Sequence, residues 1–132
     1  YSIARAYGIT LQNQGAVAAK KQLQRLMKDT VNYRLSESEI NQLGYDFLGT
    51  DNPYHLPERH LYAQALETFK LNTELFPNSW NAYDSYGEAL LMAGQLDQAE
   101  AMYRRSVELN PNSTGGKKAL EKILEKKNAK GK

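Results

Sequence analysis

The sequence contains no cysteine, which excludes disulfide bonds and thiol chemistry. It also contains only four prolines, and apolar and polar residues do not alternate as they do in a half-buried strand. These two features favour an all-α chain. The missing cysteine does not indicate a compartment, because cysteine-free proteins occur in oxidising and reducing environments alike.

Long apolar runs are missing as well. No stretch approaches the roughly 20 residues that a membrane-spanning helix needs, so we expect a soluble protein without a membrane partner. Whether it is cytoplasmic or periplasmic is left open. The chain begins at Tyr1 instead of a methionine, and we interpret it as part of a longer protein. Its 132 residues, of which 41% are hydrophobic, suffice for the core of one domain.

Catalytic and metal-binding motifs are also absent. There is no Ser-x-x-Lys, no Gly-x-Ser-x-Gly and no glycine-rich phosphate loop. His55 and His60 lie five residues apart, which is not the spacing of two metal ligands on one helix turn, although a zinc site with Asp51 or Glu58 is an alternative. We therefore predict a chain that is no enzyme and that needs no cofactor and no metal.

Charge is distributed in three blocks. Residues 1–35 carry six basic residues and one acidic residue, residues 36–116 carry four and twelve, and residues 117–132 carry seven and two. A nucleic-acid-binding protein more often keeps one continuous basic face, so we expect no nucleic-acid partner. The blocks are typical of solvated helix faces, with basic ends that can complement the acidic middle.

Helical periodicity runs through most of the chain. Ser36 and Glu39 have the spacing of a capping box at the start of one helix. Prolines and an Asp-Asn pair predict a loop over Thr50–Pro57. Gly115 and Gly116 are expected in a linker before the last helix, and residues 128–132 are expected to fray. The helices are predicted at residues 2–13, 16–28, 36–49, 58–76, 80–92, 96–110 and from 117 onward.

An internal repeat of 34 residues connects these helices. Its second half pairs a small residue with an aromatic residue and ends in proline, as in Ala99, Tyr103, Pro111 and in Ala65, Phe69, Pro77. Its first half reads Tyr83-x2-Tyr86-Gly87-x2-Leu90 and Ile40-x2-Leu43-Gly44-x2-Phe47. The N-terminal hairpin is a weaker copy with Ile3, Ala6 and Thr10, then Ala19 and Leu23.

These motifs resemble the tetratricopeptide repeat (TPR) family. The resemblance implies an all-α fold, a right-handed α-α superhelix of about three TPR-like helix hairpins plus a C-terminal capping helix. The small residues at Gly44, Gly87, Ala65 and Ala99 then allow close helix packing, and Tyr83, Tyr86 and Tyr103 are expected in the core. The single domain, 1–132, divides into a degenerate hairpin (1–35), a repeat with a nine-residue loop insertion (36–79), the best-matching repeat (80–113), and a capping helix with tail (114–132).

The family resemblance also implies a function. It predicts a protein–protein interaction scaffold that binds a peptide or partner helix in a concave groove. Arg5 can join this surface, which lacks the basic pairs that hold a carboxylate, so a neutral or basic segment is the expected ligand. The groove positions are Asn41, Tyr45, Leu48, Asp84, Glu88, Leu91 and Met92.

A second resemblance concerns the sequences of residues 7–26, 35–48 and 74–90. They are similar to the C-terminal module of some bacterial serine hydrolases, both beta-lactamase-like and esterase-like. It implies an alternative function, a non-catalytic structural or dimerisation module of a larger hydrolase. The partner would then be the protein's own upstream domain or a second copy in a homodimer.

Overall fold

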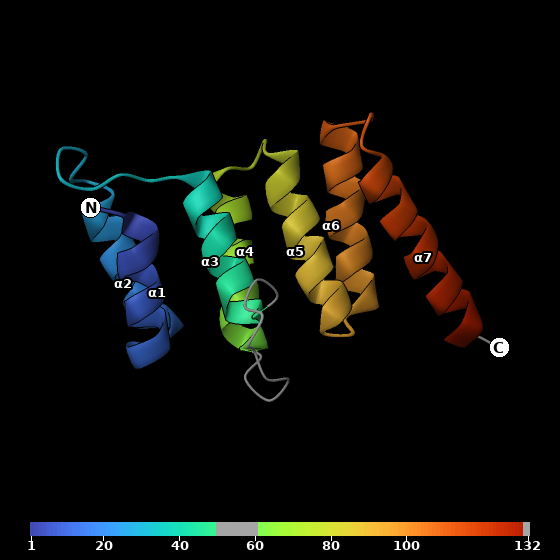
Figure 1. Cartoon of the computed structure of the whole chain (residues 1–132), viewed down its shortest axis with the longest axis horizontal. Helices are drawn as coiled ribbons and strands as arrows, with labels where there is room; N and C mark the ends of the chain where they lie inside the picture. The colour runs from blue at the N-terminus through green and yellow to red at the C-terminus, as the bar shows by residue number, and fades with distance from the viewer. Residues whose placement is uncertain (50–60, 131–132) are drawn as a thin grey trace. The chain divides into compact units, whose positions relative to one another are not determined.

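The computed structural model describes residues 1–49 and 61–130 (Figure 1). Its helices are, in chain order, α1 (Ile3–Gln14), α2 (Ala16–Leu26), α3 (Glu37–Leu48), α4 (Tyr62–Leu75), α5 (Trp80–Met92), α6 (Leu96–Leu109) and α7 (Thr114–Lys130). Within this described part the only β-type pairing is one isolated parallel bridge between Ser2 and Arg34. The prediction of an all-α chain is confirmed, while the superhelical winding of the hairpins stays a prediction.

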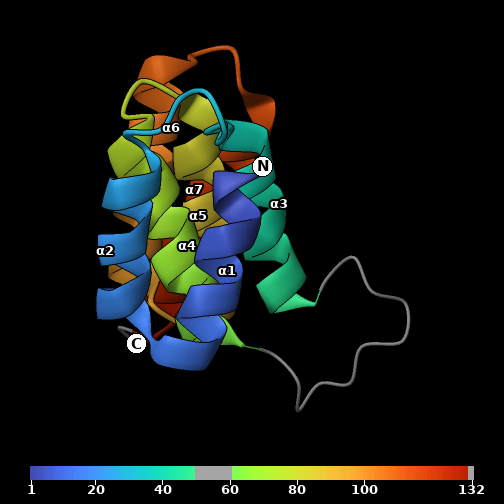
Figure 2. The ribbon, with the colours of Figure 1, turned by 90° about the vertical axis from the view of Figure 1, so that its left-hand side faces the viewer.

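The helices divide into two compact units, Tyr1–Thr68 and Phe69–Lys132, and the boundary falls inside α4. Each unit contains a helix hairpin: α1 packs on α2 in the first, and α5 packs on α6 in the second. Figure 2 shows the first hairpin facing the viewer. The predicted loop Thr50–Pro57 lies outside the described residues. The helix expected from residue 58 is described from Tyr62 onward, as α4.

The first hairpin turns on a single residue. Gly15 ends α1 and begins α2 with φ 88°, a left-handed backbone that glycine adopts without steric cost. Ile3 and Tyr7 of α1 are buried, as are Ala19 and Leu23 of α2, so the facing stripes of the two helices form the core of this hairpin.

The repeat register of α1 differs from the predicted one. The buried residues Tyr7 and Leu11 flank Gly8, and the pattern Ala4-x2-Tyr7-Gly8-x2-Leu11 repeats Tyr83-x2-Tyr86-Gly87-x2-Leu90. A Cβ atom at Gly8 would lie 2.8 Å from Cδ1 of Leu43 on α3. The predicted register, one residue earlier, also has buried positions at Ile3 and Thr10, but it places the bulky Tyr7 where Gly8 allows the close helix approach.

The predicted capping box at α3 is half formed. Ser36 Oγ accepts a hydrogen bond from the Glu39 N–H at 3.3 Å. The Glu39 carboxylate instead accepts from Ser2 Oγ at 2.7 Å and pairs with the Arg34 guanidinium at 2.7 Å, because a cation offers it a stronger contact than a backbone N–H. Since Ser2 Oγ also caps α1, this carboxylate connects the starts of α1 and α3.

The second hairpin has the close helix approach that the family resemblance implies at Gly87, with Tyr103 as the residue on the opposite helix. A Cβ at Gly87 would lie 2.9 Å from two ring carbons of Tyr103, so the glycine lets α5 meet the aromatic ring of α6. Gly94 turns the chain between the helices with φ 80°. Ser79 caps α5 by accepting from the Ala82 N–H at 3.2 Å. The cap at Ser79, the glycine at Gly87 and the turn at Gly94 therefore lie where the sequence indicates a hairpin.

The three tyrosines expected in the core differ in burial. Tyr103 is 5% exposed, whereas Tyr83 and Tyr86 are only partly buried. The Tyr83 hydroxyl donates to the Pro77 carbonyl at 3.1 Å, and the Arg105 guanidinium lies 5.9 Å from the centre of its ring. The core prediction was therefore wrong for Tyr83, because its hydroxyl reaches a polar partner at the surface, while Tyr86 is buried in part.

The last helix begins earlier than predicted. The Ser113 hydroxyl accepts from the Gly116 N–H at 3.2 Å, so Gly115 and Gly116 belong to the first turn of α7 and not to a linker. A Cβ at Gly116 would lie 3.0 Å from a methyl group of Val107, which explains why a residue without a side chain stands there. Helix α7 continues to Lys130, two residues past the expected start of fraying at residue 128.

Candidate functional site

The predicted groove draws residues from both units, so each unit is taken by itself. On α3, Asn41 and Tyr45 are partly exposed, whereas Leu48 is fully buried at 0% exposure. Leu48 follows Ile40 and Gly44 at intervals of four residues, which places all three on the buried face of the helix. The assignment of Leu48 to the groove was therefore wrong.

On α5, the predicted positions form one continuous face. Asp84, Glu88, Leu91 and Met92 follow a spacing of four, three and one residues, which keeps them on one side of the helix. The first three are partly buried, and Met92 is 41% exposed. This α5 face, defined by these four residues, is accessible and combines two carboxylates with apolar side chains.

The acidic end of the α5 face has an unfavourable charge arrangement. Burial raises the pKa of the Asp84 carboxyl above its usual range, and the neighbouring negative charge of Glu88 raises it further. The first turn of α7 lies beside it, because a Cβ at Gly116 would be 3.8 Å from Asp84 Oδ1. The positive end of the α7 helix dipole stabilises a negative charge there and offsets part of the free-energy cost of ionising Asp84.

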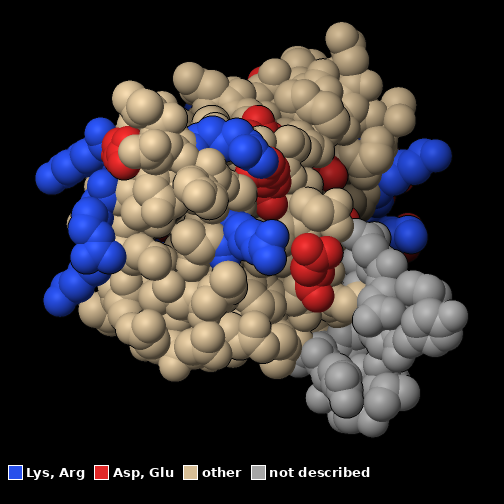
Figure 3. Space-filling view, turned by 60° about the vertical axis from the view of Figure 1, so that its left-hand side comes forward, with Lys and Arg blue, Asp and Glu red and all other residues tan. Residues whose placement is uncertain are grey.

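A hollow of about 450 Å³ lies in the first unit between α1 and α3. Its walls come from α1, from α3 and from one residue just before α4, namely Arg5, Gly8, Ile9, Gln12, Leu43, Asp46, Phe47 and Leu61. Arg5, Ile9 and Asp46 are exposed, and Leu43 is partly buried. Figure 3 turns this side of the chain toward the viewer and shows separate acidic and basic side chains on a largely uncharged surface. We call this cavity the α1–α3 hollow.

A second hollow of about 230 Å³ reaches the N-terminal ends of the same two helices and shares Arg5, Leu43 and Asp46 with the first. Its acidic residue Glu39 is already bound by Arg34 and Ser2, and these contacts, the Arg34 side chain first, lower the pKa of Glu39. Arg5 and Asp46 are therefore the charged side chains of this hollow that a ligand could still bind.

Sequence reasoning included Arg5 in this surface but missed Gly8, Ile9 and Asp46. The signal for the α1 residues was present. The rule that assigned Asn41 and Tyr45 relative to Gly44 gives Arg5 and Ile9 when it is applied to Gly8. The shifted register of the first hairpin hid this correspondence. Asp46 carries no such signal, because its place beside α1 depends on how α1 and α3 pack.

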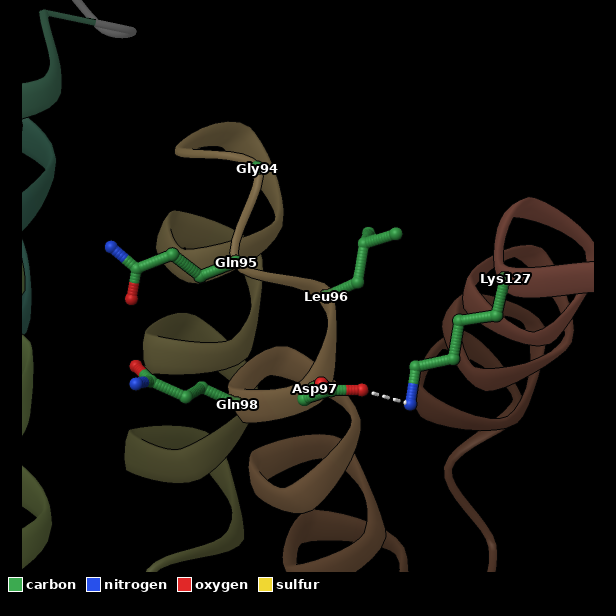
Figure 4. Close-up of a pocket in the computed structure, with 6 residues that line it drawn as sticks. All are labelled: Gly94, Gln95, Leu96, Asp97, Gln98 and Lys127. Atoms are coloured by element: carbon green, nitrogen blue, oxygen red, sulfur yellow. Dashed lines mark ion pairs between the residues drawn. The ribbon is translucent and has the colours of Figure 1, made fainter. Parts of the chain in front are cut away.

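A further pocket lies in the second unit, where the start of α6 faces the end of α7 (Figure 4). Lys127 Nζ pairs there with Asp97 at 2.5 Å and with Glu100 at 3.2 Å. The hydrogen bond to Asp97 is the largest cause of the raised pKa of Lys127, and the same bond lowers the pKa of Asp97. This arrangement joins α6 to α7, and the ion pairs already use the charges that a ligand would need.

The residues that the structure describes contain no group of three or more potential metal ligands, while His55 and His60 lie outside them. In the same part of the chain, no helix combines the length and the apolar character that crossing a bilayer requires.

The fold is an all-α, TPR-like helical repeat. Residues 80–125 match the family model described as tetratricopeptide repeat. This match covers α5, α6 and most of α7, and such repeats generally mediate protein–protein interaction. A search of curated proteins found no match. The similarity to modules of serine hydrolases therefore stays a prediction.

Proposed function

We propose that this chain is a protein-interaction module and that the α5 face binds a neutral or basic segment of a partner. The observation that carries the proposal is the position of Asp84 and Glu88, one helix turn apart in the part that matches the tetratricopeptide repeat. Asn41 and Tyr45 of α3 are further candidate contacts because they are partly exposed.

The charges of the α5 face support this choice of ligand. Glu88 adds its negative charge to the field at Asp84, and burial weakens the hydration of that carboxylate. A cationic group placed between the two would reduce their repulsion, whereas an acidic ligand would increase it. A partner segment containing lysine or arginine is therefore favoured over an acidic one.

Apolar area supports a peptide over a small inorganic cation. Met92 is 41% exposed at the end of the α5 face, and Leu91 beside it is partly exposed. Methionine is unbranched and adapts its shape to different partners. A segment with one basic residue and an apolar residue about two turns away would use both ends of this face.

A selection from a library of random peptides on the immobilised chain tests the proposal. We expect the recovered peptides to be enriched in lysine and arginine. Asp84→Lys should weaken their binding at least about tenfold, because it replaces an attraction with a repulsion. Tyr45→Ala should weaken binding less. Circular dichroism would check that both variants remain helical.

Glu121→Lys is the matched control, since it makes the same charge change at an exposed position of α7. Equal losses in Asp84→Lys and Glu121→Lys would reduce the effect to net charge and reject the α5 face. Recovery of acidic peptides would reject the proposed ligand. Light scattering on the chain alone would separate this function from dimerisation. If the chain forms a dimer without any partner and Asp84→Lys abolishes that dimer, the α5 face binds a second copy of the chain.

A further inference from the structure

We propose that the C-terminal end of α7, residues 124–130, is a strap that covers the start of α6 and is held there by the side chain of Lys127. When Lys127 loses the attraction of its two carboxylate partners, the strap leaves α6 while the rest of the unit stays folded. This device lies in the second unit and uses none of the residues of the α5 face, so it goes beyond the function proposed above.

Apolar packing holds only the first part of α7. A Cβ at Gly116 would lie 3.0 Å from a methyl group of Val107, and Ile123 is fully buried at 0% exposure. Leu124 is already 42% exposed, and the side chains described after it are exposed or partly buried. Apolar burial therefore ends about two turns before the helix does.

Ionic contacts replace apolar packing in the strap. The Lys127 ammonium pairs with Asp97 at 2.5 Å and with Glu100 at 3.2 Å, both on α6. Glu125 and Lys126, the other charged side chains that the structure describes in the strap, form no ion pair within the described part of the chain. The Asp97 side chain is 91% exposed, so dissolved ions can reach this cluster.

The place of the cluster makes attachment depend on these carboxylates. Asp97 lies in the first turn of α6, where the helix dipole is positive and backbone N–H groups lack helical partners. An ammonium group alone would be repelled from this helix end, whereas Asp97 and Glu100 attract it. Screening or loss of that attraction therefore shifts the equilibrium toward the detached strap.

Detachment would widen the pocket between α6 and α7. The pocket has a volume of about 470 Å³, and Lys127 is its lining residue on α7. Figure 4 shows Leu96 and Asp97 directed toward α7, whereas Gln98 points to the opposite side. Leu96 is partly buried with the strap attached, so the strap controls how far this apolar side chain meets the solvent.

Amide hydrogen exchange followed by NMR tests the strap residue by residue. In Lys127→Gln we expect exchange at residues 126–130 to become at least about threefold faster, while amides in the middle of α5 and α6 keep their rates. Lys126→Gln is the matched control, because it removes the same charge from an exposed position one residue away. Lys127→Arg keeps the charge and should keep the wild-type rates.

Salt tests the same contact in the unaltered chain. Raising the NaCl concentration from about 0.01 M to about 1 M shortens the Debye length from about 30 Å to about 3 Å. We expect faster exchange in the wild-type strap at the higher concentration. Lys127→Gln should show little further response, because its attraction to α6 is already lost.

The absence of cysteine allows the uncovered surface to be measured directly. A thiol introduced by Leu96→Cys should react about threefold faster with an uncharged maleimide when Lys127→Gln is added. Removing a nearby positive charge by itself lowers the thiolate fraction, so a faster reaction must come from exposure. Gln98→Cys is the control, since its position points away from α7, and its labelling rate should not change.

Four results would overturn the proposal. Exchange in the strap that responds neither to Lys127→Gln nor to salt is the first, and an equal acceleration in Lys126→Gln is the second. The third is an equal acceleration throughout α5 and α6, which would mean that the whole unit unfolds. The fourth is a labelling rate at Leu96→Cys that does not depend on Lys127. No measurement here uses a ligand, so failure of the strap is distinguishable from failure of the α5 face.

Discussion

The two hairpins use the same glycine position for different contacts. In the second unit, the space that a side chain at Gly87 would occupy is filled by Tyr103, which belongs to the same hairpin. In the first unit, the corresponding space at Gly8 is filled by Leu43, which lies on α3 beyond the hairpin. One motif therefore tightens a hairpin in one unit and brings α1 beside α3 in the other.

This difference also separates the two candidate surfaces. The contact of Gly8 with Leu43 brings α1 beside α3 and leaves Arg5 and Asp46 at the edge of a hollow between two helices. The contact of Gly87 with Tyr103 lies inside a hairpin, so the accessible residues of α5, Asp84 among them, form a face on one helix. A shared motif thus leads to surfaces of different shape and charge.

The largest effect is expected for Gly87→Leu. A Cβ alone would lie 2.9 Å from the Tyr103 ring, which is rigid and only 5% exposed, so the larger side chain must displace α6. We expect a loss of about 3 kcal/mol in the free energy of unfolding, measured by urea denaturation. Gly115→Leu is the control, since a Cβ there has no neighbour within 4 Å. An unchanged urea midpoint for Gly87→Leu would contradict the close hairpin contact.

A smaller effect is expected for Gly8→Ala, which tests the other half of the comparison. The new Cβ would lie 2.8 Å from Leu43 Cδ1, but that atom ends a flexible side chain and can turn away. Alanine also favours the helix over glycine by about 1 kcal/mol, so the net change should stay within about 1 kcal/mol. Gly87→Ala, facing a rigid ring, should cost more. The opposite order would show that the α1–α3 contact is the tighter one.

The predictable part of the fold is local. Helical periodicity, the glycine turns and the serine caps lie in short stretches, so the hairpins follow from local patterns. The family resemblance implied close helix packing at Gly87, whereas the contact of Gly87 with Tyr103 is seen only in the structure. The register of α1 does not follow from local patterns, because Ile3 and Ala6 fit the apolar pattern almost as well as Ala4 and Tyr7. Only packing against Leu43 distinguishes the two registers.

The candidate sites were less predictable for the same reason. The α5 face follows from positions on one helix, and its four residues were named from the sequence. The burial of Leu48 and the apposition of Arg5 and Asp46 depend on how separate helices pack, which no spacing within one helix encodes. Likewise, the Glu39 carboxylate fits a capping box locally but binds Arg34, a cation from the preceding connector.

The smallest effect is expected for Asp84→Asn, which tests the electrostatic side of the comparison. Burial first, and the charge of Glu88 second, raise the pKa of Asp84 in the folded chain. Below the unfolded pKa, near 3.9, Asp84 is protonated in both states and costs nothing. As the pH rises through the raised folded pKa, the unfolded state releases the proton more readily, so the ionised carboxylate lowers stability. The variant should therefore be slightly more stable than wild type at pH 7, by less than about 1 kcal/mol for a partly exposed group, and equally stable near pH 3.5.

Asp46→Asn is the control in the first unit, where an exposed carboxylate outside any described ion pair should change thermal stability little at either pH. A midpoint for Asp84→Asn that falls below wild type at pH 7 would mean that Asp84 has a favourable partner, and the α5 face would then lose the charge that the proposed basic ligand requires.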